Sequence, residues 1–193
     1  VDDAAELFKD EKKKKIMILA LEIPLETARY CIEKAALNGI RVILDPGGIK
    51  SPLEDILDER IFLLKPNEHE ARILTGLSIH DFKSARKAAA VLLARGVQNV
   101  LISHGASGAY LFTKKTSLHL SCPEVEDSGT YDETGCGDQV TAVVAACLAE
   151  GKSLIEATEM SVLAGTLQFH KEGIQPVSRE ELLINWSRLK SLD

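Results

Sequence analysis

The chain runs Ile16-Met17-Ile18-Leu19-Ala20-Leu21 and then, after Pro24 and a helical pattern that stops at Asn38-Gly39, Ile40-Arg41-Val42-Ile43-Leu44-Asp45. Both quoted runs have the length of a strand and carry apolar residues on both faces. Strands of this kind are typical of a parallel sheet whose two faces are covered by helices. The asparagine and glycine between the helical pattern and the second run are a common helix stop.

The same alternation continues along the chain. Strands are predicted at residues 61–65 and 100–103, and helices at 67–75 and 81–95, closed by Gly76 and Gly96. Residues 109–113 and 117–122 predict an antiparallel hairpin around Lys114-Lys115, and three helices follow, from about 135 to 150, 154 to 170 and 179 to 189. The sequence therefore predicts the α/β class, a three-layer sandwich with a mostly parallel sheet covered by helices, in one domain over residues 1–193.

Composition narrows the class of protein. The 193 residues are 45% apolar and 27% charged, which is enough for one core, and the net charge of -6 gives no electrostatic reason to expect a nucleic-acid partner. No apolar stretch approaches the roughly 20 residues of a membrane span, no signal-peptide pattern opens the chain, and the basic run Lys12 to Lys15 is interpreted as a solvated helix end. The four cysteines form no C-x-x-C pair, so reduced thiols in a cytoplasmic protein are expected.

The stretch Asp132-Glu133-Thr134-Gly135-Cys136-Gly137-Asp138, which precedes an apolar helical run, is the strongest functional signal. Two glycines let main-chain N–H groups approach a ligand, and the start of a helix favours negative charge. Asp138 would lie in the first turn, where it could take a proton from an alcohol. The simpler alternative is that Asp132 or Thr134 caps the helix. A dinucleotide fingerprint is disfavoured, because it needs glycine where Val140 stands.

Two other segments follow predicted strands, where ligands gather in open α/β sheets. Asn67 and Glu70 lie three residues apart on one helical face and could hold a hydrated Mg²⁺, although an N-terminal capping box explains the same spacing. Ser103-His104-Gly105-Ala106-Ser107-Gly108 offers a hydroxyl and amides to a nucleotide phosphate, although two glycines also suffice for an ordinary turn.

Taken in order, these motifs resemble those of the ribokinase-like (phosphofructokinase B type) sugar kinases. Residues 132–138 look like the family's D-T-x-G-A-G-D signature, with Glu133 and Cys136 as departures. Residues 66–76 are similar to its P-N-x-x-E-x-x-x-L-T-G segment, and residues 103–108 to its T-x-G-x-x-G nucleotide turn. Residues 21–24 and 173–176 are similar to segments that touch the sugar and form a monovalent-cation loop in ribokinases.

The resemblance implies ATP-dependent transfer of a γ-phosphoryl group to a primary sugar hydroxyl, with ribose or a similar sugar expected. It implies that Asp138 is the base and also contacts the sugar, with Glu22, and that the amides of Gly135, Cys136 and Gly137 stabilise the transferring group. Ser103, Gly105 and Gly108, with Asn67 and Glu70, would bind ATP and Mg²⁺, the last two residues acting through water. Asp132 and Thr134 would contribute to a K⁺-type site.

The resemblance covers the carboxyl-terminal two-thirds of a family member. The chain begins at Val1 without Met, so we expect a longer gene product whose amino-terminal part supplies the lid and part of the sugar site, and a homodimer is possible in that complete protein. Val177 stands where ribokinases usually carry Ser, which leaves K⁺ activation open. Three alternatives remain open: a nucleoside kinase, a non-catalytic nucleotide- or sugar-binding protein on the same fold and, more distantly, a redox enzyme.

Overall fold

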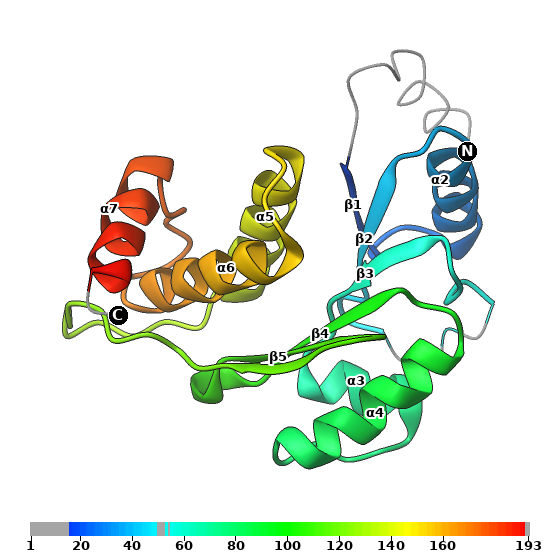
Figure 1. The fold of residues 1–193 in the computed structure, drawn as a ribbon, viewed down its shortest axis with the longest axis horizontal. Coiled ribbons are helices and arrows are strands. Elements are labelled where there is room, and N and C mark those ends of the chain that lie inside the picture. Colours follow the sequence, from blue (N-terminus) through cyan, green and yellow to red (C-terminus); the bar gives the residue numbers. More distant parts are fainter. Residues whose placement is uncertain (1–15, 50–52, 54, 192–193) are drawn as a thin grey trace. The chain divides into compact units, whose positions relative to one another are not determined.

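The computed structural model describes residues 16–49, 53 and 55–191, which fall into two compact units (Figure 1). Unit 1 holds the described residues up to His104 together with Tyr110–His119. Unit 2 holds Gly105–Ala109 and the described residues from Leu120 onward. The single domain expected over residues 1–193 stays a prediction, and the helix end expected at Lys12 to Lys15 lies outside the described residues.

One six-stranded sheet organises unit 1. Its strands stand in the order of the sequence, β1-β2-β3-β4-β5-β6, and β1 to β4 pair in parallel. The register pairs Ile18 with Ile43 and Leu44 with Leu64, and it shifts between Val42 and Ile43. The strands are β1 (Ile16–Ala20), β2 (Arg41–Asp45), β3 (Ile61–Leu64), β4 (Asn99–Ser103), β5 (Ala109–Thr113) and β6 (Ser117–Leu120). The predicted mostly parallel sheet is confirmed.

The last two strands form the predicted hairpin. Thr113 donates its backbone N–H to the carbonyl of Thr116 at 2.8 Å, which closes a tight turn between β5 and β6. Parallel neighbours need a long crossover, so this short connection makes the two strands antiparallel. The strand β6 ends at Leu120, two residues before the predicted end.

Three helices accompany the sheet in unit 1: α2 (Leu25–Leu37), α3 (Glu68–Thr75) and α4 (Phe82–Ala94). The helix α3 ends at Gly76, whose φ of 75° is a left-handed cap that glycine adopts without strain. Residues of all three helices share one apolar cluster with alternate strand residues such as Val42 and Val100. The intervening Ile43 and Leu101 are also fully buried, so the central strands are covered on both faces, as their apolar runs predict.

Unit 2 contains the helices α5 (Cys136–Ala149), α6 (Leu154–Phe169) and α7 (Arg179–Lys190). The first two pack closely against each other, and Gly165 makes this possible. A Cβ atom at Gly165 would lie only 2.8 Å from Cγ2 of Val140, well inside ordinary contact distance. A glycine in the middle of a helix weakens it by about 1 kcal/mol relative to alanine, so its use here fits the close approach of α5. Within the described ranges, no helix combines the length and apolar character needed to cross a membrane.

Candidate functional site

In unit 1, polar groups line the carboxyl ends of three neighbouring strands. Asp45 ends β2, and Lys65 directly follows β3, its Nζ lying 3.1 Å from Oδ2 of Asp45. Both side chains are largely buried. Two residues after Lys65, Asn67 forms a parallel bridge with Ser103, the last residue of the neighbouring strand β4. Parallel strands end at one edge of the sheet, so the structure brings the predicted Asn67 and Ser103 together there.

Asn67 and Glu70 form the capping box that was the simpler explanation of their spacing. Oδ1 of Asn67 accepts the Glu70 backbone N–H at 2.8 Å, and Oε2 of Glu70 accepts the Asn67 N–H at 2.9 Å. The second carboxylate oxygen of Glu70 accepts the N–H of Gly48 at 3.3 Å. The capping interpretation is confirmed, and the buried carboxylate also ties the loop after β2 to the start of α3.

These contacts limit how Mg²⁺ could bind here. Each oxygen of Glu70 already accepts a backbone N–H, and the side chain is only 8% exposed. A carboxylate oxygen keeps a second lone pair, and Mg²⁺ retains most of its water shell in proteins. Asn67 and Glu70 therefore fit a hydrated ion held through water better than an ion bound directly. Among the described residues, no three His, Cys, Asp or Glu side chains gather as a metal cluster.

The predicted nucleotide turn is a single 3₁₀ turn over Gly105–Ser107, closed by a hydrogen bond from the Gly108 N–H to the Gly105 carbonyl at 3.1 Å. Gly108 has a φ of +91°, and a Cβ atom there would lie 2.0 Å from the Leu120 carbonyl oxygen. Only glycine fits at this position. Gly105 also has positive φ, but a Cβ atom would meet nothing within 4 Å.

The helix α5 begins without a side-chain cap. Its first flanking residue is Gly135, in the left-handed region at φ 78°, and among the described residues no side chain caps the first N–H groups of the helix. The capping interpretation of Asp132 and Thr134 is therefore wrong, because the glycine turn, not a side chain, starts the helix. Asp132 instead holds the backbone: its Oδ1 accepts the Thr134 N–H at 2.8 Å and its Oδ2 accepts the Gly173 N–H at 2.9 Å.

The three amides expected to face an anion differ in availability. The Cys136 N–H donates to the Glu133 carbonyl at 3.2 Å, which makes it the least available of the three. Gly137 lies in the first turn, where N–H groups have no partner within the helix. Asp138 is exposed in the same turn. Burial, together with the charges of Glu133 and Asp132, raises the pKa of the Cys136 thiol, which favours its protonated form.

Sequence reasoning missed two features. One is the buried Lys65–Asp45 ion pair, whose signal is a lysine and an aspartate at the ends of neighbouring predicted strands. The other is Gln168 in the last turn of α6, which is only 1% exposed. Its signal is an amide at a buried position in an otherwise apolar helical pattern. Glu22, implied as a sugar contact, is exposed in the loop after β1.

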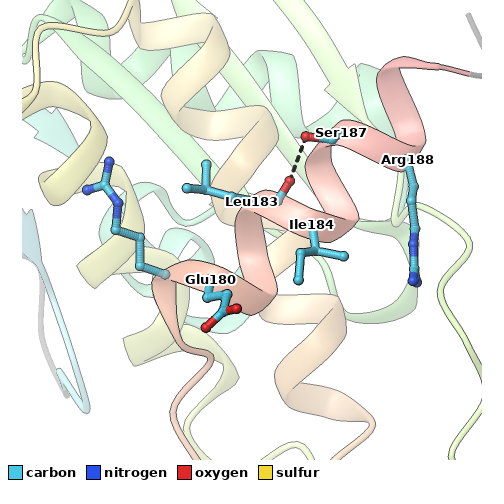
Figure 2. A pocket seen from close by; sticks show the side chains of 6 residues that line it. Glu180, Leu183, Ile184, Ser187 and Arg188 are labelled. Atoms are coloured by element: carbon cyan, nitrogen blue, oxygen red, sulfur yellow. Dashed lines mark hydrogen bonds between the residues drawn. The ribbon is translucent and has the colours of Figure 1, made fainter.

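A pocket outside all of these segments lies on the exposed face of α7 (Figure 2). Leu183 and Ile184 form its apolar part, and Ser187 donates to the Leu183 carbonyl at 2.9 Å within the helix. All of its lining residues come from this one helix, and none is a predicted site residue. We therefore assign it no role in the chemistry.

Comparisons with known proteins agree with the family resemblance. Residues 4–181 match the pfkB family of carbohydrate kinases. The chain is 33% identical over 171 residues to ribokinase from Haemophilus influenzae and 29% identical over 175 residues to deoxyribokinase from Salmonella typhi, covering 86% and 91% of this chain.

The solved structure of Arabidopsis thaliana ribokinase with ribose and ATP superposes with a TM-score of 0.84 at 29% identity, over 95% of this chain and 58% of that one. The chain spans about half the length of the curated relatives it matches, 54% and 55% for the two named above. The extent of the family match and the agreement in fold lead to one conclusion: the chain belongs to the pfkB family of carbohydrate kinases.

Proposed function

We propose that the complete protein is an ATP-dependent sugar kinase that transfers the γ-phosphoryl group of ATP to a primary hydroxyl of ribose or a similar sugar. The observation that carries the proposal is the start of α5. A glycine in the left-handed region opens the helix without a side-chain cap, and an exposed carboxylate, Asp138, stands in its first turn. This arrangement leaves donors for an anion and a base for an alcohol in one short segment.

In the proposed reaction, Asp138 accepts the proton of the sugar hydroxyl while the hydroxyl oxygen forms a bond to the γ-phosphorus. The bond from that phosphorus to the bridging oxygen of ADP breaks, and ADP leaves. The amides of Gly135 and Gly137, assisted by Cys136 if its N–H turns away from Glu133, stabilise charge on the transferring group. Ser103, Gly105 and Gly108 bind the nucleotide.

When bound, Mg²⁺ would neutralise part of the negative charge of the phosphates. Asn67 and Glu70 would hold the ion through water. Glu22 and Asp138 are proposed to contact the sugar. The monovalent-cation role implied for Asp132 and Thr134 is not part of this proposal, because the side-chain amide of Gln168 donates to the backbone carbonyl of Thr134.

The relatives named above include both a ribokinase and a deoxyribokinase, which supports a pentose as substrate. The four free thiols support a reducing compartment, and we propose the cytoplasm. A homodimer of the complete protein stays a prediction.

The first test is a coupled ADP-release assay on the complete protein with ribose, 2-deoxyribose, fructose and adenosine. We expect ADP release to require a pentose. Preferred release with adenosine would identify a nucleoside kinase instead, and no release with any acceptor would favour a non-catalytic binding protein.

The second test replaces the proposed base. Asp138→Asn should lower kcat by about 10²–10⁴-fold, the usual contribution of a positioned base, while the Kd for ATP changes little. Glu180→Gln is a matched control, since Glu180 is an exposed first-turn carboxylate of α7. If Asp138→Asn kept full kcat, Asp138 would not be the base.

A further inference from the structure

Gln168 lies in the last turn of α6 with its side chain directed at two backbone carbonyls. Its Nε2 donates to the Gly173 carbonyl at 3.0 Å and, in a longer contact, to the Thr134 carbonyl at 3.5 Å. Both neighbours are acceptors, so the NH₂ end of the amide must face them. Gln168 therefore presents a buried donor between the segment that precedes α5 and the loop that follows α6.

The same two segments are joined by backbone hydrogen bonds. The Asp132 N–H donates to the Phe169 carbonyl at 2.9 Å, and the Asp132 carboxylate accepts the N–H groups of Thr134 and Gly173. Both carboxylate oxygens thus have donors. Together these bonds fix residues 132–134, which lead directly into Gly135 and the start of α5.

A monovalent cation implied by the family resemblance does not fit this arrangement. Such an ion would need oxygens from Asp132, Thr134 and the loop at Gly173. Here the two carbonyl oxygens receive the Gln168 amide, and the carboxylate receives two N–H groups. A cation among these groups would meet the positive ends of the N–H dipoles of Gln168, Thr134 and Gly173, and Gln168 is only 1% exposed.

We propose that the side-chain amide of Gln168 takes the place of the monovalent cation in this protein and makes its kinase activity independent of K⁺. This inference rests on the proposed function. Gln168 is a positioning residue: it bridges the two carbonyls that a cation would otherwise bridge. It thereby holds the segment that leads through Gly135 into α5, and the first turn of α5 carries the proposed base, Asp138. A neutral donor is sufficient because Asp132 is already satisfied by backbone amides.

The test on the unaltered protein compares kcat and KM in K⁺ with those in tetramethylammonium at equal ionic strength. We expect both constants to be unchanged. Stimulation by K⁺ would overturn the proposal. The melting temperature is measured in the same two salts, and it should also be the same, whereas stabilisation by K⁺ would contradict the proposal even if no kinase activity were found.

Two variants show whether Gln168 is responsible. Gln168→Glu replaces the donor by a carboxylate facing two carbonyl oxygens, so this variant should lose kcat and thermal stability in tetramethylammonium and regain part of both in K⁺. Gln168→Met keeps the length of the side chain but removes the donor, and it should show a weaker version of the same response. The control is Gln98→Glu. Gln98 is an exposed glutamine of unit 1 whose Nε2 also donates to a backbone carbonyl, that of Glu59 at 2.8 Å, and this variant should not respond to the cation.

The outcomes separate the two proposals. If no sugar releases ADP but Gln168→Glu is stabilised by K⁺ and the unaltered protein is not, the proposed function fails while the role of Gln168 stands. If neither variant responds to K⁺ in turnover or in melting temperature, the amide does not stand in for a cation, whatever the protein's activity.

Discussion

The side chain of Asp132 accepts hydrogen bonds from two backbone segments, one at Thr134 before α5 and one at Gly173 after α6. Its hydrogen bonds with Thr134, and then the bond from the Gly173 N–H, hold the pKa of its carboxyl below the ordinary value for aspartate. Hydrogen bonds to the charged form have this effect, because they are lost when the carboxylate is protonated. The charged state of Asp132 is therefore linked to the order of the Gly173 loop.

The pH dependence of this link has a definite sign. A carboxyl whose folded pKa is depressed adds stability above its unfolded pKa, about 3.9 for aspartate, and that contribution is lost as the pH falls through the folded value. We expect the amide NMR signal of Gly173 to stay constant from neutral pH down to about 4 and to shift only at lower pH. In Asp132→Asn this titration should disappear. A midpoint above the ordinary aspartate pKa would show that the hydrogen bonds do not favour the charged form.

Among the secondary-structure elements, the turn between β4 and β5 offers a matched pair of glycines. Gly108→Ala combines a left-handed backbone with a Cβ atom 2.0 Å from the Leu120 carbonyl, whereas Gly105→Ala carries only the backbone strain. We expect Gly105→Ala to lower the free energy of unfolding by about 1–2 kcal/mol, and Gly108→Ala to lower it by clearly more and to raise the KM for ATP.

Urea unfolding and ATP kinetics of both variants test this expectation. Equal losses in the two variants would mean that the backbone of Leu120 moves aside easily, and that the close approach at Gly108 does not constrain the turn.

The helices and strands were largely predictable because their signals are local. Apolar runs on both faces predicted the parallel strands, and Gly39 and Gly76 predicted two helix ends. The hairpin's second strand was predicted two residues too long, because the last residue of a strand depends on where its backbone pairing stops and not on residue type alone. The sequence also allowed Asp132 or Thr134 to cap α5, and this interpretation is wrong. The residue that precedes the helix is Gly135, in the left-handed region, where a capping side chain usually stands.

The candidate site was predictable only in part. The motifs of residues 67–70, 103–108 and 132–138 are short, so their residues could be named from the sequence. The contacts of Gln168 with Thr134 and Gly173, and of Lys65 with Asp45, join residues far apart in the chain or hidden within an apolar pattern. The sequence marks each of these residues as a polar group in an unusual position, but the partner of each residue depends on the folded packing and cannot be named from local pattern.

For the whole molecule, the reactivity of the four cysteine thiols measures how accessible each of them is to solvent. Cys31 and Cys147 are buried, while Cys122 and Cys136 are partly accessible. We expect the native protein to react with Ellman's reagent at Cys122 first and at Cys136 more slowly, because burial raises the pKa of the Cys136 thiol and the thiolate is the reactive form. Cys31 and Cys147 should react only after denaturation. Fast reaction of all four in the native protein would contradict the buried positions.

The order of the strands bears on how the protein is made. Each strand of the sheet lies beside the strand synthesised immediately before it, from β1 through β6. A ribosome delivers roughly 5–20 residues per second, which is slow compared with local folding steps. Among the strands that the structure describes, no early strand has to wait for a distant one before it can pair. We therefore expect nascent chains that have emerged through β4 to hold packed β1, β2 and β3 already, so that the apolar runs of the sheet spend little time exposed during synthesis.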